Sequence, residues 1–332
     1  MKNKILLIGA GILFLSMLAI GTTLDFMTIH LLPKALFYFD QNSINDLVWV
    51  EIRLPRLLLA FTTGAALGLS GYLMQVLVRN PLADPYVLGS SSGASLFAAI
   101  FYVWFAPGYA SLGLLLLLTF CGAFGTNVIS LFLSNVKGKI IPYRMILVGI
   151  AISSLAISLL SLLLYISGED QSWKNIIFWT FGSFQSASWD KVLYIGIIVS
   201  IFTLLSFVLF GPFQIMELGE ENANRIGVPV QRYRIILLLI SSVLTAAAVS
   251  MAGPIGFIGL IMPHIVRILF KFQLTNSFVP WLCYLSGMFL MLCEIASTFI
   301  FPPQGVPAGI LMSLIGVPFF LYMLLNTHDK NI

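Results

Sequence analysis

The feature that most constrains this chain is a series of apolar runs, each about as long as a membrane is thick. Runs that reach or approach 20 residues lie near residues 5–21, 56–78, 92–106, 111–133, 145–166, 192–210, 235–252, 254–270, 281–301 and 306–325. A helix needs about 20 apolar residues to cross roughly 30 Å of hydrocarbon. Helices satisfy their own backbone polar groups in lipid, whereas barrel strands would show a period-two alternation. The sequence therefore predicts an all-α polytopic membrane protein with about ten transmembrane helices.

The composition supports this prediction and excludes a water-soluble globular protein. Of the 332 residues, 59% are hydrophobic and 9% are charged, whereas soluble domains carry about 25% charged residues. The net charge of +4 comes from basic residues scattered singly or in pairs. None of them forms a basic stripe that could follow a phosphate backbone. We therefore expect the lipid bilayer around the chain and no nucleic-acid partner.

The distribution of basic residues predicts the orientation. If the N-terminus lies inside and ten spans alternate, twelve of the 17 basic residues fall inside and five outside, as the positive-inside rule requires. The five on the outside are Lys34, Arg53, Arg56, Lys174 and Lys191. We expect both termini in the cytoplasm. Whether residues 1–21 are retained or removed as a signal stays open.

Signatures of enzymes and metal sites are missing from the sequence. It has no GxxxxGK[ST] phosphate loop, no HExxH motif and no cluster of His or carboxylates at ligand spacing. The three cysteines lie in apolar runs without CxxC spacing, as small buried hydrophobic residues do. We predict no catalytic residue, no metal and no cofactor. Any ATP must then be bound and hydrolysed by a partner.

A polar stretch between the second and third runs, RNPLADPYVLGSSSGAS at residues 79–95, predicts a break in the helical pattern. Irregular backbone at membrane depth is tolerated only where protein or a water-filled cavity covers it. Asn80 and Asp84 are therefore candidates for a gate. The segment GPIGFIGLIMPHIVR at residues 253–267 has the same character. The serines at 90–92 most simply serve close helix packing, although they could line a pathway.

Residues 211–233 form the longest polar stretch on the predicted inside. Gly and Pro bracket a short helical piece there, at residues 216–226. The second run, RLLLAFTTGAALGLSG, also echoes the seventh, RIILLLISSVLTAAAVSMAG, which crosses in the opposite direction. Such an inverted repeat is a common plan of transporters.

Taken together, these segments resemble the hallmarks of the FecCD family, the permeases of siderophore, heme and cobalamin ABC importers. The resemblance runs in order from about residue 47 to 325, through RLPRLLLAFTTGAALGLSGYLMQVLVRNPLADPYVLGSSSGAS, GEENANRIG, MAGPIGFIGLIMPHIVR and PAGILMSLIGVPFFLYML. It implies a single transmembrane permease domain, residues 1–332, in the bacterial plasma (inner) membrane. It also implies a dimer with a second permease copy, two cytoplasmic ATPase subunits and a periplasmic or lipid-anchored substrate-binding protein.

The resemblance assigns roles to particular residues. It implies that Arg53 and Arg56 dock the binding protein; the alternative is interfacial snorkelling. It implies a cytoplasmic gate at Asn80, Pro81 and Leu82, with a second part at Pro142 and Tyr143. The segment that contacts the ATPase comprises Gly219, Glu220, Glu221, Ala223, Arg225 and Gly227. The family's usual Ala-Arg pair is Ala223-Asn224 here, which leaves the contact of Arg225 open.

A second departure concerns the ninth span, where the family has an Asp and, four residues later, an Arg. This chain has Glu294 and Thr298. An acid inside a span is a functional candidate, so the rival prediction is an ion-coupled secondary transporter with Glu294 as its relay. For the importer, iron bound to a siderophore is the expected cargo, with cobalamin and heme as alternatives. The sequence does not decide between a homodimer and a heterodimer.

Overall fold

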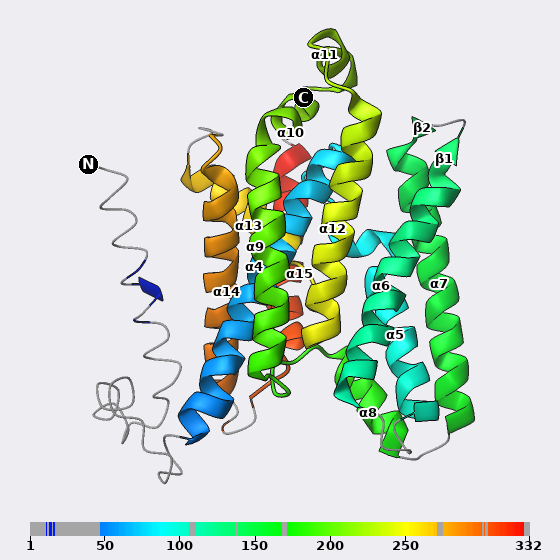
Figure 1. The fold of residues 1–332 in the computed structure, drawn as a ribbon, viewed down its shortest axis with the longest axis vertical. Coiled ribbons are helices and arrows are strands. Elements are labelled where there is room, and N and C mark those ends of the chain that lie inside the picture. The colour runs from blue at the N-terminus through cyan, green and yellow to red at the C-terminus, as the bar shows by residue number, and fades with distance from the viewer. Residues whose placement is uncertain are drawn as a thin grey trace.

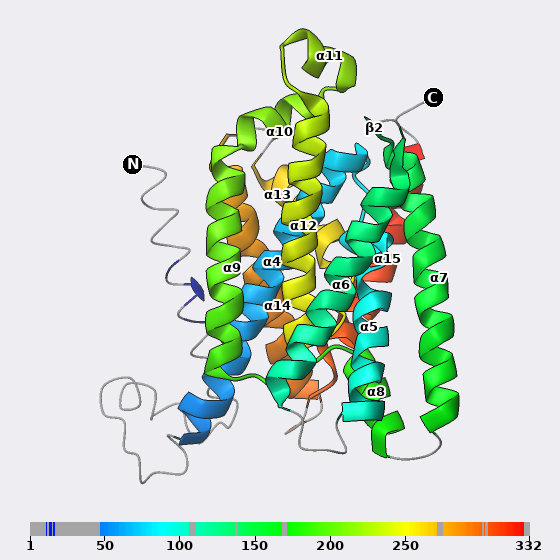
Figure 2. The same cartoon turned by 45° about the vertical axis from the view of Figure 1, so that its right-hand side comes forward.

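The computed structural model describes residues 47–105, 111–136, 139–167, 171–270, 275–300, 302 and 305–328, together with residues 11, 13, 14 and 16. Within these ranges nine long or medium helices make up the bundle (Figures 1 and 2). They are α4 (Leu54–Val78), α5 (Ser90–Ile100), α6 (Leu112–Ser134), α7 (Pro142–Ser167), α9 (Trp189–Val208), α12 (Val230–Ala252), α13 (Ile258–Leu269), α14 (Phe278–Ile300) and α15 (Ala308–His328).

The shorter elements lie at the two ends of the bundle or in its breaks. They are η2 (Trp49–Arg53), η3 (Pro85–Leu88), η4 (Phe101–Phe105), α8 (Gln171–Thr180), α10 (Phe210–Glu217), α11 (Glu220–Arg225) and the two strands β1 (Asn135–Val136) and β2 (Lys139–Ile140). The strands pair antiparallel, with Asn135 opposite Ile140. We refer to the end that carries α10, α11 and the hairpin as the α11 end, and to the opposite end as the α8 end (Figure 1).

The prediction of a polytopic all-α membrane protein is confirmed. In the described residues, seven helices are long and apolar enough to cross a membrane, and two further apolar segments, Ser90–Phe105 and Ile258–Leu269, are shorter. Nine of the ten predicted runs therefore correspond to helices. The first predicted span, near residues 5–21, lies almost wholly outside the described residues.

The core of the bundle is built from α4, α12 and α14, whose membrane-length windows are mostly buried, whereas less than a third of each of those of α6, α7 and α9 is buried. Small residues let the core helices approach closely. A Cβ at Gly64 or Gly68 would overlap residues of α14, and one at Gly71 would overlap the backbone of Gly259. These glycines thus let α4 pack closely against α14 and α13.

Two of the helices are half-length and follow breaks in the chain. After α4 ends, the chain turns back through η3 before α5 begins, and after α12 it turns back before α13 begins (Figures 1 and 2). The α4–α5 pair and the α12–α13 pair run in opposite directions, as the inverted repeat predicts. Ser70 on α4 and Ser241 on α12 join the two long helices, with their hydroxyl oxygens 2.8 Å apart.

The predicted single helical piece at residues 216–226 is wrong. The chain instead forms two short helices, α10 and α11, separated at Leu218 and Gly219. Gly219 has φ 107°, a value that L side chains rarely adopt, and it forces the chain to change direction between the two helices. Ala223 on α11 is fully buried, so the small helix rests on the bundle instead of standing free.

Candidate functional site

The two breaks meet beside a cavity of about 720 Å³ at one wall of the bundle. Its lining comes from η3 and the start of α5, from the segment after α8, from the break before α13, and from α15. The lining residues are Tyr86, Ser91, Thr180, Phe181, Pro254, Gly256, Gly309, Ile310, Ser313, Leu314, Val317 and Pro318. None of these twelve residues is charged. A wall of this kind can contact a large molecule without holding it by a specific ion pair.

Hydrogen bonds tie the two breaks to each other. The backbone N–H of Ile255 donates to the Tyr86 hydroxyl oxygen at 3.2 Å. The Asp84 carboxylate accepts a hydrogen bond from the backbone N–H of Tyr86 at 2.8 Å and another from that of Phe257. Phe257 has φ 68°, and its ring lies so close to Gly316 on α15 that a Cβ there would overlap it. The candidate gate residue Asp84 therefore caps η3 and links it to the break before α13.

The other predicted gate residues lie towards the α11 end. Asn80 and Pro81 are exposed, and the Asn80 side chain accepts a hydrogen bond from the Leu82 backbone N–H at 2.9 Å. Leu82 is half-buried and packs against the main core. Pro142 is half-buried and Tyr143 is 69% exposed, at the start of α7. None of the described hydrogen bonds joins the two parts of the predicted gate.

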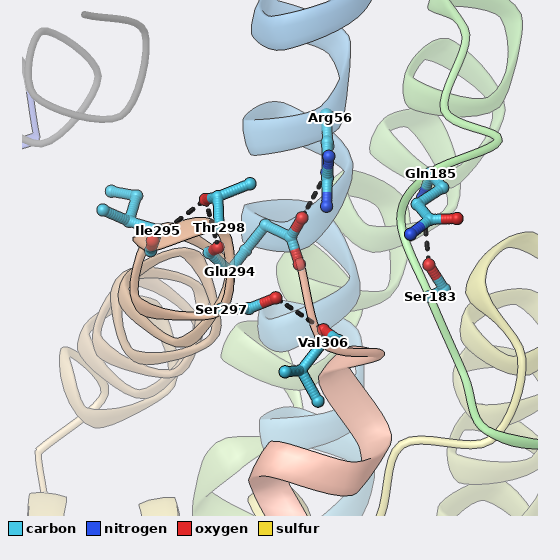
Figure 3. Close-up of polar contacts among 8 residues, drawn as sticks. All are labelled: Arg56, Ser183, Gln185, Glu294, Ile295, Ser297, Thr298 and Val306. Atoms are coloured by element: carbon cyan, nitrogen blue, oxygen red, sulfur yellow. Dashed lines mark hydrogen bonds and ion pairs between the residues drawn. The ribbon is translucent and has the colours of Figure 1, made fainter. Parts of the chain in front are cut away.

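Arg56 and Glu294, predicted for separate roles, form an ion pair between α4 and α14 (Figure 3). The Arg56 Nε donates to Glu294 Oε1, and the Glu294 side chain is 2% exposed against 15% for Arg56. Beside them, the Thr298 hydroxyl donates back to the Glu294 carbonyl at 2.9 Å. The Ser297 hydroxyl donates to the Val306 carbonyl in the segment that leads to α15. The intramembrane acid thus has its counter-charge within the chain.

Arg53, the second predicted docking residue, ends η2 one turn before Arg56 and is half-buried. The α4 end that carries both arginines lies at the opposite end of the bundle from α11 (Figures 1 and 2). This separation is what a partner on each side of the membrane requires.

The predicted ATPase-contact segment is fastened to the bundle by Arg234 on α12. Arg234 Nη2 donates to Glu220 Oε2 on α11 at 2.9 Å, and its Nη1 donates to the Ile140 carbonyl in β2 at 3.1 Å. The Ile140 backbone N–H donates to Gln231 Oε1 at 3.1 Å. Arg234 is buried, with 4% exposure. One buried cation therefore connects α11, α12 and the hairpin.

A second ion pair fastens α10. Arg267 on α13 donates through Nη2 to Glu217 Oε1 at 2.9 Å, and its guanidinium lies 5.7 Å from the centroid of the Tyr72 ring, a cation–π contact. Burial raises the pKa of the Glu217 carboxyl above its ordinary value, and the neighbouring Arg267 offsets only part of that rise. Each of the two short helices is thus held by an ion pair between its own carboxylate and an arginine of a bundle helix.

Several residues of the segment point away from the bundle. Glu221 and Arg225 are exposed, and Gly227 is exposed with φ 91°. Leu218 and Ile226, which the sequence did not single out, are 64% and 61% exposed. Sequence reasoning also missed Arg234, Arg267, Glu217 and Gln231; an arginine at the edge of an apolar run was the available signal for the first two.

Comparison with known proteins gives a consistent result. Residues 7–326 match the FecCD transport family. The hemin transport system permease protein HmuU of Yersinia pestis is 34% identical, over 98% of this chain and 97% of that protein. The iron(3+)-hydroxamate import system permease protein FhuG of Bacillus subtilis is 30% identical over 98% of each. An inward-facing structure of a metal-chelate type ABC transporter superposes with a TM-score of 0.83 at 27% identity, covering 97% of this chain and 99% of that one.

Proposed function

The chain belongs to the FecCD transport family, and from this we propose that it is the membrane-spanning permease subunit of a binding-protein-dependent ABC importer. The relatives named above are permeases for hemin and iron(3+)-hydroxamate, and the similar solved structure is of a metal-chelate type transporter. The cargo we propose is iron bound to a siderophore, with heme and cobalamin as the alternatives.

The observation that carries the proposal is the pair of fastened helices at the α11 end. In an importer of this kind, ATP is hydrolysed by two separate cytoplasmic subunits, and their movement has to reach the spans. The α10–α11 segment presents Leu218, Glu221, Arg225 and Ile226 to the outside, while Glu217 and Glu220 are bonded to the bundle. A segment built in this way can bind an ATPase subunit through its exposed side chains. It can then transmit the movement of that subunit to the spans through its two ion pairs.

The proposal places the α11 end and both termini in the cytoplasm of a bacterium, and the α8 end outside its plasma membrane. Arg53 and Arg56 then face a periplasmic or lipid-anchored binding protein, with Arg56 held in place by Glu294. The uncharged cavity beside Tyr86 and Ser313 then forms one wall of the pathway, which a second permease copy completes. Asn80, Pro81 and Leu82 close it towards the cytoplasm, together with Pro142 and Tyr143.

The rival function is a secondary transporter that uses Glu294 as a proton relay. The ion pair of Glu294 with Arg56 favours a structural role for this acid, because it joins α4 to α14 across the bundle. We therefore prefer the ATP-driven importer.

Reconstitution separates the two functions. The permease is placed in liposomes with the two ATPase subunits and the binding protein, and uptake of the ferric siderophore is measured. We expect uptake with ATP inside and none from a proton or sodium gradient alone. Uptake from a gradient, without ATPase subunits, would overturn the proposal.

A further inference from the structure

A second cavity, of about 230 Å³, lies at the α8 end among α6, α8, α9 and α12. It is separate from the wall beside Tyr86, and it is smaller than the roughly 300–1,000 Å³ of pockets that enclose a whole drug-sized ligand. A bulky chelate therefore does not fit in it. Its polar lining includes Asn175, Ser186, Lys191 and Ser250, and its apolar lining includes Leu112 and Phe178.

Lys191, which lines this cavity, is a buried cation whose described contacts are all with neutral groups. The residue is 3% exposed. Its Nζ donates to the Ser186 hydroxyl at 2.8 Å and to the Met251 carbonyl at 3.4 Å. The ion pairs found in the described part of the chain belong to Arg56, Arg234 and Arg267. A buried charge is stable only when it is paired, and the ammonium has three donors, one more than these two contacts use.

The surroundings of the cavity indicate what kind of anion would pair with Lys191. Leu112 at the start of α6 is 48% exposed, and Phe178 on α8 is 64% exposed. Both are apolar side chains at the surface of a bundle whose spans are long and apolar enough to lie in lipid. The lining of the cavity therefore combines a buried cation with exposed apolar side chains. An amphiphile with a negatively charged head matches this combination.

We propose that this cavity binds the headgroup phosphate of a phospholipid, with Lys191 as the counter-charge and the acyl chains against Leu112 and Phe178. The site lies at the α8 end, on the side where the predicted positive-inside topology leaves few cations. The inference rests on the membrane location of the chain and not on the import of any cargo. Its failure would leave the proposed importer function untouched.

The test measures the thermal unfolding of the full-length permease in detergent with three added probes. Dioctanoylphosphatidylglycerol supplies head and chains, dioctanoylglycerol supplies the same chains without phosphate, and inorganic phosphate supplies the anion alone. We expect stabilisation by the phosphatidylglycerol only. Equal stabilisation by dioctanoylglycerol would overturn the role of the phosphate, and equal stabilisation by inorganic phosphate would overturn the role of the lipid. This comparison needs no variant.

Two substitutions locate the site. Lys191→Met should weaken binding of the phosphatidylglycerol by about tenfold or more, because it removes a charge-assisted contact. Lys174→Met is the matched control, because Lys174 is an exposed lysine of α8 at the same end that does not line the cavity; it should bind like the wild type. Lys191→Arg, which keeps the charge, should retain binding even if the Met variant does not fold. Native mass spectrometry counts the bound lipid, and unchanged binding in Lys191→Met would overturn the site.

Discussion

Arg234 and Glu220, fourteen residues apart, form an ion pair of 2.9 Å between α12 and α11, and the arginine side chain is 5% exposed while that of the glutamate is 39% exposed. The ion pair therefore joins a buried side chain of the bundle to a side chain at its surface. The next residue, Glu221, is exposed and takes part in none of the described ion pairs. The two adjacent glutamates thus have different environments, and substitution can separate their roles.

Glu220→Gln should uncouple ATP hydrolysis from transport, because it leaves the buried Arg234 without its anionic partner and loosens α11. We expect a loss of about 1.5 kcal/mol of stability, the low end of the range for a hydrogen bond to a charged group, because the Glu220 side chain is 39% exposed. ATPase activity of the complex and uptake are measured together in proteoliposomes. Glu221→Gln removes the same charge one residue away, from an exposed side chain that takes part in none of the described ion pairs, so it should leave the stability of the permease unchanged. Equal behaviour of the two variants would contradict the fastening role of Glu220.

Arg56→Met should destabilise the permease by about 3–5 kcal/mol, because it leaves the Glu294 carboxylate buried without a counter-charge. The double variant Arg56→Met with Glu294→Met should recover most of that loss, since an apolar pair can replace a buried ion pair. Thermal unfolding of the purified protein checks both. If the double variant is as unstable as the single one, the pair is not what holds α4 to α14 at that end.

Arg53→Glu should weaken binding of the substrate-binding protein by about tenfold or more, and the defect should grow as salt is lowered, because rim charges govern such encounters. Affinity is measured at several ionic strengths with the permease in nanodiscs. Copurification of the ATPase should be unchanged, which serves as the control for folding. An affinity equal to that of the wild type would remove Arg53 from the docking surface.

Single cysteines at Asn80, Leu82 or Tyr143 should cross-link between two permease copies in one nucleotide state and not in another. Exposed Cys121 must first be replaced by Ser, while Cys283 and Cys293 are buried. Tyr143 is 69% exposed and Leu82 is half-buried, so the cysteine at 143 should react faster. Leu82→Ala should also leak small solutes without ATP. Cross-linking and leak that are the same in every nucleotide state would show that the gate lies elsewhere.

Gly71→Ala should destabilise the fold by about 1–3 kcal/mol, the usual cost of overpacking a core, because the new methyl group would overlap the backbone of Gly259. Gly125→Ala on α6 is the control, since nothing lies within 4 Å of a Cβ there. Thermal unfolding compares the two variants. If Gly71→Ala is as stable as Gly125→Ala, close approach of α4 to α13 is not required.

The positions of the spans and of the two breaks could be predicted, because each depends on a local signal. Apolar runs of membrane length mark the spans, and Pro81, Pro85 and Pro254 with their neighbouring glycines mark the places where a helix cannot continue. The break before α13 and the break before α5 were therefore both anticipated. Their meeting through Tyr86 and Ile255 was not, because the two residues are 169 positions apart.

The connections that fasten the site could not be predicted, because most of them join residues far apart in the sequence. Arg56 and Glu294 are separated by 238 positions, and nothing in either local sequence marks the other as its partner. The hairpin at residues 135–140 has two-residue strands, too short to show any alternation. The division between α10 and α11 lies at one glycine with a positive φ, Gly219, inside a segment that otherwise favours helix.

The two hydrogen bonds of Ile140 have a mechanical consequence. A loose linker would absorb a displacement of α11, but Ile140 is bonded to α12 through both its N–H and its C=O, and it lies two residues before the first residue of α7. A displacement of α11 should therefore be passed to the first turn of α7 through these hydrogen bonds. Of the seven spans, α7 is the least buried, so it is the helix that tilts at the smallest cost in packing. We therefore expect a displacement of α11 to move the peripheral helix α7 and not the buried core helix α4.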